Sequence, residues 1–226
     1  MNKIISFSLW GTNPKYCVGA IKNAHLARKH FPDWTCRFYL GNSVDDGTRQ
    51  ALSNFCNTEL VEMEELGDWR GMYWRFRPAS EEDVDVMVSR DCDSRLGPRE
   101  KEAVDEWLAS DRVFHSMRDH PAHGIPILGG MWGARKGAVP NMTVLIDKHI
   151  TDENRWGVDQ DFLTDHIYPL VKDIWFEHDA FYAIDHRSGY KKGFPTPRDR
   201  ETMFFVGQPF DKDDNPEIKL DQVGHD

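Results

Sequence analysis

The sequence predicts one α/β domain built on a mainly parallel β-sheet that becomes mixed toward its C-terminal part. Two observations predict this class. Apolar runs of strand length alternate along the chain with stretches of helical periodicity, which is typical of strands joined by crossover helices. The first strand candidate, KIISFSL at 3–9, is largely apolar, as a strand covered on both faces is. The length of 226 residues suits one domain of ordinary size.

The elements of the first part follow in order. A helix is expected over 15–31, because its apolar positions recur at spacings of three and four residues, and Pro32 ends it. Those apolar positions are Cys17, Ile21, Ala24, Ala27 and Phe31. The remaining elements expected here are strands over 34–40, 59–63 and 83–89 and a short helix over 47–56.

The second part continues the alternation. A helix is expected over 98–109, because Pro98 suits a first helical turn. Asp159 is a possible N-cap for a later helix. The other expected elements are strands over 112–117, 125–132 and 173–178 and helices over 141–150 and 159–171. We expect residues 1–207 to form the domain and 208–226 to be a polar, loosely held C-terminal tail.

Composition excludes several classes of protein. The net charge of −10 argues against nucleic acid as the main partner, because such proteins usually carry a basic excess. No apolar window is long enough for a transmembrane segment, and the N-terminus lacks the apolar region of a signal peptide. Cys17 and Cys36 lie in apolar patterns and are expected to be buried thiols, which suits a reducing compartment. A cytoplasmic protein is therefore expected.

The stretch VMVSRDCDSRL at 86–96 carries the most informative motif. An apolar run ends in Asp91 and Asp93, at the carboxyl end of a predicted strand, where ligands bind in such sheets. Side chains two residues apart in extended chain point the same way, so these like charges lie close together unless a cation neutralises them. Mg²⁺ and Mn²⁺ prefer oxygen ligands and often keep substrate phosphates in their shell. A solvated aspartate-rich turn is the plainer alternative.

One enzyme class with a strand-end D-x-D motif fits poorly. Phosphohydrolases of the haloacid dehalogenase type use D-x-D-x-[T/V], but Arg95 occupies the last position of that pattern here. The motif also lies in mid-chain, whereas the nucleophile of those enzymes lies near the start.

Eight segments in order resemble small glycosyltransferases of the GT-A fold found in large DNA viruses and in bacteria. The resemblance covers residues 4–207, and no segment is decisive alone. The segments are SFSLWG (6–11), YWRF (73–76), SRDCDSRL (89–96), MRDHPAH (117–123), ILGGMWG (127–133), GVDQDFL (157–163), EHDAF (177–181) and FPTPR (194–198). The resemblance implies a Rossmann-like three-layer fold, a nucleotide-sugar donor and a divalent metal, Mn²⁺ or Mg²⁺.

The donor nucleotide is expected at the end of the first strand and around the D-x-D motif. Trp10 can offer an aromatic face to a base, although core packing is the alternative. The guanidinium fork of Arg75 matches phosphate oxygens, although a surface ion pair is the alternative. The residues expected to bind the donor nucleotide are Ser8, Leu9, Trp10, Gly11, Arg75, Arg90 and Asp91.

The sugar and the acceptor are expected along two further segments. The glycines of ILGGMWG leave room for a ligand against the backbone. The residues assigned to the donor sugar or the acceptor are Asp119, His120, Gly129, Gly130 and Gln160. A loop held by Asp–His hydrogen bonds is the alternative for the first two.

Asp159 and Asp161 are the expected catalytic residues. Through the resemblance they bind the acceptor in a retaining enzyme, or one of them is the base in an inverting enzyme. Favourable charge at the first turn of a helix is the alternative.

The resemblance implies that the metal binds Asp91, Asp93 and a C-terminal histidine. His178 ends an apolar strand and is the preferred candidate, whereas His186 begins the competing string HRSGYKK. The resulting hypothesis is a metal-dependent glycosyltransferase that moves a sugar from a UDP- or GDP-sugar to a glycan or another hydroxyl acceptor. The alternatives are a nucleotide-sugar-binding protein without turnover and a D-x-D phosphohydrolase.

Overall fold

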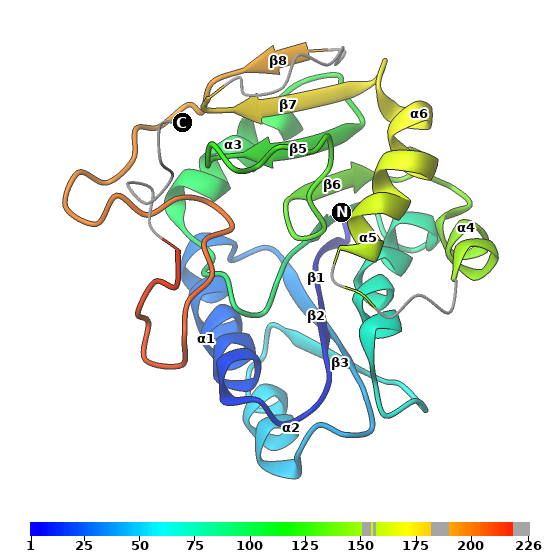
Figure 1. The fold of residues 1–226 in the computed structure, drawn as a ribbon, viewed down its shortest axis with the longest axis vertical. Helices are drawn as coiled ribbons and strands as arrows, with labels where there is room; N and C mark the ends of the chain where they lie inside the picture. The colour runs from blue at the N-terminus through cyan, green and yellow to red at the C-terminus, as the bar shows by residue number, and fades with distance from the viewer. Residues whose placement is uncertain (151–154, 156, 182–189, 219–226) are drawn as a thin grey trace.

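Eight strands form one mixed sheet in the order β3-β2-β1-β4-β6-β5-β7-β8 (Figure 1). The structure is a computed structural model that describes residues 1–150, 155, 157–181 and 190–218. Neighbouring strands are parallel except where β6 pairs with β4 and with β5. The predicted α/β class, with a mainly parallel sheet that becomes mixed, is therefore confirmed.

The elements alternate along the chain as expected. The strands are β1 (Lys3–Leu9), β2 (Thr35–Leu40), β3 (Thr58–Glu62), β4 (Val86–Ser89), β5 (Phe114–Arg118), β6 (Trp132–Arg135), β7 (Trp175–Asp179) and β8 (Tyr190–Lys192). The α-helices are α1 (Pro14–His30), α2 (Asp46–Ser53), α3 (Pro98–Ala109), α4 (Met142–His149), α5 (Val158–Phe162) and α6 (Tyr168–Val171). A 3₁₀ helix, η1 (Trp69–Ser80), precedes β4, and a π-helical turn, η2 (Leu163–Ile167), joins α5 to α6.

Helices cover both faces of the sheet and bury two separate cores (Figure 1). On one face α1, α2 and α3 pack over Ile5, Phe7 and Leu9 of β1. On the other face η1, α4 and the α5–α6 segment pack around Ile4. Alternate residues of one strand thus enter opposite cores, as the pleat of a strand requires. Each fully buried side chain of this size stabilises the fold by about 1.5–3 kcal/mol.

Helix α1 presses directly on the loop that carries the D-x-D motif. The Asn13 side chain accepts a hydrogen bond from the Lys15 amide at 3.0 Å and caps the helix. A Cβ on Gly19 would collide with the Cys92 carbonyl oxygen, so only glycine allows this approach. The Asn23 amide donates to the Cys92 and Ser94 carbonyl oxygens at 3.2 and 2.9 Å. The backbone of the motif is therefore held by α1.

Helix η1 is not among the elements predicted from the sequence. Its buried residues Tyr73, Phe76 and Ala79 recur at a spacing of three, which is the 3₁₀ period. The Asp68 side chain accepts a hydrogen bond from the Arg70 amide at 2.9 Å and caps the start. Both signals are visible in the sequence.

The strand predicted over 125–132 is wrong, because β6 begins only at Trp132. The residues before it form a turn in which the Met131 amide donates to the Leu128 carbonyl at 3.1 Å. Ile127 is buried in that loop, so its apolar character reflects burial without a strand. Strand β8 was also not predicted, whereas the other predicted strands and helices lie within three residues of the observed ones.

The helix predicted over 159–171 is continuous but changes type at its centre. Gly157 is its N-cap, so the interpretation of Asp159 as a side-chain cap is wrong. Pro169 has no amide to donate to the preceding turn, and the Tyr168 amide bonds to the Leu163 carbonyl five residues back. Among the described residues, no helix has the length and apolar character needed to cross a membrane.

The C-terminal segment (208–218) is ordered against the domain, contrary to the expectation of a loosely held tail. The Phe210 amide donates to the Asp93 carbonyl at 2.9 Å, and the Phe210 ring is 4% exposed. Arg95 bonds to Asp214 at 2.8 Å and lies over the Phe210 ring at 5.3 Å. Ion pairs and one buried ring therefore fix a segment whose composition is polar.

We expect Phe210→Ala to lower the free energy of unfolding by about 3 kcal/mol, because it leaves a cavity where a buried ring packs. Phe204, which contacts Phe210 edge to face at 5.0 Å but is 39% exposed, is the matched control. Phe204→Ala should cost under about 1 kcal/mol. Urea denaturation measures both values. Equal, small losses for the two variants would mean that the C-terminal segment does not contribute to the folded core.

Candidate functional site

The order of the strands places the candidate site between β1 and β4. From β1 the chain adds β2 and β3 on one side and β4 on the other, so the connections diverge at this point. In open α/β sheets, ligands bind beyond the carboxyl ends of the strands at such a switch point. Ser6 of β1 pairs with Ser89 of β4, so the loops that follow these two strands leave the sheet side by side.

Arg75 joins the D-x-D loop to helix α5. Its side chain is only 7% exposed. One terminal nitrogen bonds to the carboxylate of Asp91, and the other lies 2.9 Å from Oδ2 of Asp159. Its amide also donates to Oγ of Ser8 at 3.0 Å. One guanidinium therefore gathers residues from the ends of β1 and β4 and from the start of α5.

Two glycines close the gap between these carboxylates. A Cβ on Gly129 would collide with the Asp159 carboxylate and lie 2.7 Å from the Arg75 Nη2 atom. A Cβ on Gly130 would collide with the Asp91 carboxylate. Because β6 runs antiparallel to β4, its start lies at the carboxyl end of β4 and delivers both glycines to the site.

Asp91 and Asp93 lie in a turn in which the Ser94 amide donates to the Asp91 carbonyl oxygen at 3.3 Å, so the extended chain expected there is not present. Cys92, between them, is buried. The Cys92 thiol lies 3.3 Å from the Ser8 carbonyl oxygen. The carboxylate of Asp93 lies 2.9 Å from Nζ of Lys15. Burial, followed by the nearby charge of Asp91, raises the pKa of Asp93. Asp91 and Asp93 are therefore close enough for their charges to interact.

The donor set fits a hard divalent cation. Asp91 and Asp93 offer carboxylate oxygens, which Mg²⁺ and Mn²⁺ prefer, and the side chain of Asp91 is 39% exposed. Within the described ranges, no three His, Cys, Asp or Glu side chains are grouped so as to hold a metal. Two protein ligands are enough for an ion that completes its shell with waters and substrate phosphates.

His178 does not join the two aspartates. It lies on β7, three strands from β4, which corresponds to about 14 Å. Its Nδ1 atom lies 2.8 Å from Nε2 of His115, and its Nε2 atom lies 3.0 Å from Oε2 of Glu106. Burial lowers its pKa, although Glu106 opposes that change. The competing candidate, His186, lies outside the described residues.

The loop after β1 reaches the site only in part. Leu9 is buried in the core below α1, and Ser8 serves to position Arg75. Trp10 is half-buried and packs edge to face on Trp74 at 6.2 Å. Gly11 has a φ of 70°, which favours glycine, and its amide donates to the Ser43 hydroxyl at 2.8 Å.

Arg90 is turned away from the candidate site. It is fully buried, pairs with Glu100 of α3, and donates to the Ser89 and Trp132 carbonyl oxygens at 2.7 and 3.1 Å. The expectation that Arg90 binds the donor nucleotide is not supported by this placement. A buried carboxylate on α3 was the partner that the sequence did not reveal.

Asp119 and His120 are also committed to internal contacts. The Asp119 carboxylate accepts hydrogen bonds from Arg99 at 2.8 Å and from the Val206 amide at 3.0 Å, and it pairs with Arg198. His120 is buried and packs against the Phe205 ring at 4.5 Å. The Asp119 amide also donates to Nδ1 of His123 at 3.1 Å, and the Ala122 amide donates to Nδ1 of His120 at 3.1 Å. This placement favours the alternative of a loop held by Asp–His hydrogen bonds, with arginines as further partners of Asp119.

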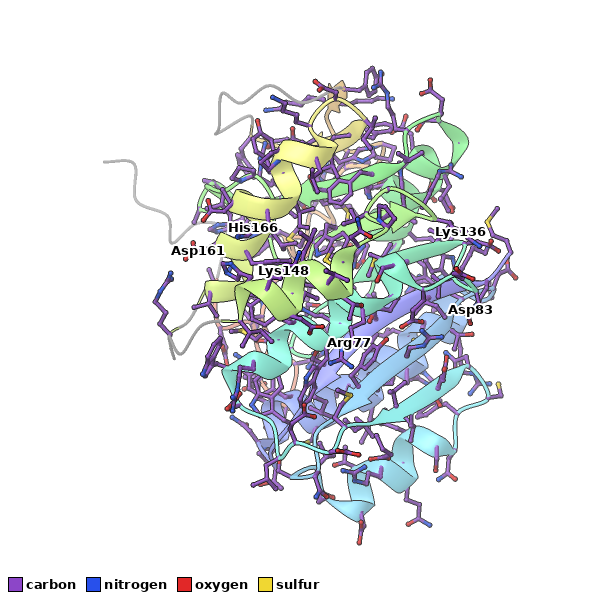
Figure 2. All side chains as sticks on the ribbon, turned by 90° about the vertical axis from the view of Figure 1, so that its right-hand side faces the viewer. Arg77, Asp83, Lys136, Lys148, Asp161 and His166 are labelled. Atoms are coloured by element: carbon purple, nitrogen blue, oxygen red, sulfur yellow. The ribbon has the colours of Figure 1, made fainter. Side chains whose placement is uncertain are left out.

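Helix α5 separates its two aspartates. Asp159 is 2% exposed, and burial raises its pKa while Arg75 opposes that rise. Asp161 is half-exposed and pairs with Arg155, and Figure 2 shows it at the periphery of the molecule. Gln160, between them, is partly buried. Only Asp159 therefore joins Asp91 and Arg75.

Lys15 is a site residue that the sequence did not single out. Its ammonium bridges Asp93 and Glu217 of the C-terminal segment, at 2.9 and 2.6 Å. The signal available in the sequence was a lysine in the first turn of the helix that follows the first strand. Its partner Glu217 lies 202 positions away, so their contact could not be foreseen.

Comparison with solved structures identifies several of similar fold. A glycosyltransferase involved in the glycosylation of the major capsid of PBCV-1 is 14% identical, covers 79% of this chain and 82% of its own, and has a TM-score of 0.53. The glycosyltransferase GlyE of Streptococcus pneumoniae TIGR4 is 14% identical over 78% of this chain and 44% of its own, with a TM-score of 0.51.

A third solved structure has a different reaction. The 4-diphosphocytidyl-2C-methyl-D-erythritol synthase of Anaerococcus prevotii DSM 20548 is 7% identical, covers 80% of this chain and 90% of its own, and has a TM-score of 0.54. No family model matches the sequence, and no curated protein matches it. Identities this low establish the fold and leave the reaction to the site. The chain therefore has the GT-A fold.

Proposed function

We propose that this protein is a metal-dependent glycosyltransferase that moves a sugar from a nucleoside-diphosphate sugar to a hydroxyl acceptor. The observation that carries the proposal is that Arg75 forms two ion pairs. Arg75 joins Asp91, at the strand-end D-x-D motif, to Asp159, at the start of α5. Diphosphate-side and acceptor-side carboxylates are thereby held in one site at the switch point of the sheet.

Asp91 and Asp93 are proposed to hold Mn²⁺ or Mg²⁺. When bound, the ion supplies positive charge to the leaving diphosphate and so stabilises the transition state. A Cβ at Gly129 or Gly130 would collide with the Asp159 or the Asp91 carboxylate, so these glycines make room for the two carboxylates. The donor sugar is proposed to bind beside them. Trp10 and Gly11 are proposed to line the base and ribose of a UDP- or GDP-sugar.

Asp159 is proposed to act on the acceptor, with Gln160 beside it. Arg75 fixes the orientation of the Asp159 carboxylate through Oδ2. In an inverting reaction Asp159 would take the proton of the acceptor hydroxyl as that oxygen attacks the anomeric carbon. In a retaining reaction it would orient the acceptor by a hydrogen bond. The proposed acceptor is a glycan or another molecule that offers a hydroxyl group.

One assay separates this proposal from its alternatives. The protein is incubated with UDP- and GDP-sugars, with and without Mn²⁺, and the released phosphorus species are identified. Metal-dependent release of nucleoside diphosphate supports sugar transfer. A binding protein without turnover releases nothing. A phosphohydrolase is recognised in the same assay by the phosphate that it releases when simple phosphate esters are added.

We expect Asp93→Asn to abolish metal-dependent turnover while the fold persists. Loss of a metal ligand should weaken Mn²⁺ binding by more than the roughly 10–100-fold that loss of an outer-shell partner costs. Asp105→Asn is the control, because Asp105 pairs with Lys101 on the exposed surface of α3. Wild-type turnover by Asp93→Asn in the presence of EDTA would contradict a metal site at this residue.

Asp159→Asn separates the two possible roles of the acceptor-side carboxylate. If Asp159 is the base, the transfer rate should fall by about 10²–10⁴, because an amide cannot take the proton. If it binds the acceptor, the KM for the acceptor should rise while hydrolysis of the donor in water continues. Asp161→Asn, at the periphery, is the matched control. Transfer at the wild-type rate and acceptor affinity in Asp159→Asn would exclude both roles.

Arg75→Met should lower the free energy of unfolding by about 3 kcal/mol, because it leaves the buried Asp159 carboxylate without its partner. The double variant Arg75→Met/Asp159→Asn removes that stranded charge and should recover part of the loss. Urea denaturation of the four proteins of this cycle gives the coupling energy. Losses that simply add would show that Arg75 and Asp159 are not coupled.

A further inference from the structure

Lys15 occupies a position between the D-x-D motif and the C-terminal segment. Its ammonium lies 2.9 Å from Oδ2 of Asp93 and 2.6 Å from Oε2 of Glu217. All three side chains come from different parts of the fold: the first turn of α1, the end of β4 and the C-terminal segment. None of these contacts is needed to cap α1, since Asn13 performs that role.

The charges around this lysine favour a further cation. Two groups of ion pairs meet at the D-x-D motif: Lys15 pairs with Asp93 and Glu217, and Arg75 pairs with Asp91 and Asp159. Two positive charges against four negative charges leave a formal charge of −2. A single divalent ion would neutralise this charge, but Lys15 already holds one of the two carboxylates that would bind it.

The geometry points to Lys15 as an exchangeable counter-ion that releases Asp93 when metal and donor arrive and then binds the donor diphosphate. This inference rests on the proposed glycosyltransferase function and assigns to it a diphosphate-binding residue. A nucleoside diphosphate brings negative oxygens to the metal. The Lys15 ammonium can therefore leave the Asp93 carboxylate and bind a diphosphate oxygen, so that it keeps an anionic partner throughout.

The side chain of Lys15 suits such an exchange. Its backbone is fixed in the first turn of α1, where its amide is bonded to Asn13. Lysine carries a compact charge on a flexible four-carbon stem, so the ammonium can swing while the backbone stays in place. Glu217 is the second holder of that ammonium, and its carboxylate is about two-fifths exposed. Glu217 therefore competes with Asp93 for the Lys15 ammonium and weakens the ion pair between Lys15 and Asp93.

The first experiment measures the affinity of the full-length protein for Mn²⁺ alone by calorimetry. Lys15→Met should bind Mn²⁺ about tenfold more tightly than wild type, because a competing charge-assisted hydrogen bond to Asp93 is gone. Glu217→Gln should bind it more weakly, because Lys15 is then left to Asp93 alone. If Lys15 competes with Mn²⁺ for Asp93, removing the ammonium should raise the Mn²⁺ affinity, and removing its second partner, Glu217, should lower it.

The second experiment measures UDP and GDP binding at saturating Mn²⁺. Lys15→Met should lose about tenfold in affinity for whichever nucleotide the wild type binds, and Lys15→Arg should recover part of it. Lys22→Met is the matched control. Lys22 lies about two turns along α1 and bonds to Asp214 of the same segment at 2.6 Å, without touching Asp93. It should change neither affinity by more than about twofold.

The results separate this inference from the function on which it rests. A wild type that binds neither Mn²⁺ nor a nucleoside diphosphate contradicts the proposed glycosyltransferase. A wild type that binds both, with Lys15→Met indistinguishable from Lys22→Met, contradicts the role of Lys15 only. If Lys15→Met does not fold, Glu217→Gln provides the test. A Mn²⁺ affinity that is unchanged or higher in Glu217→Gln contradicts the competition between Lys15 and the metal for Asp93.

Discussion

The buried Arg75 guanidinium between Asp91 and Asp159 is the interaction on which the candidate site depends. A charge out of water is costly unless it is paired and hydrogen-bonded, and two carboxylates near one another repel. Arg75 meets both conditions at once, since each terminal nitrogen has its own carboxylate. The rest of the site depends on this bridge. It anchors helix α5 to the D-x-D loop, and Gly129 and Gly130 stand where any side chain would collide with the bridged carboxylates.

Local pattern predicted those parts of the fold and site that depend on neighbours in the chain. The alternation of elements, the strand that ends just before the D-x-D motif, and the nearness of Asp91 and Asp93 along the chain are all local properties. The order of the strands is not local. Because β6 and β5 lie between β4 and β7, His178 is placed far from the aspartates although the motif pattern suggested that it joins them. Arg90 was misassigned because its partner lies on a helix that follows the motif.

The polar composition of residues 208–226 was also the reason for predicting a loosely held C-terminal tail. Apolar burial is the usual reason for order, yet residues 208–218 are held mainly by charged side chains, with Phe210 as the one buried ring among the contacts that fix them to the D-x-D loop. A sequence does not show which distant cation will meet a given carboxylate. The contact between Lys15 and Glu217 is therefore visible only in the structure, where Lys15 joins the segment to Asp93.

The most direct test of the account is a crystal structure with Mn²⁺ and a nucleoside diphosphate, in which the metal is located by its anomalous scattering. The account predicts one strong peak in contact with Asp91, Asp93 and the diphosphate oxygens, beside an intact Arg75–Asp159 ion pair. A peak at His178 and Glu106, with nothing at the aspartates, would contradict the assignment of the site.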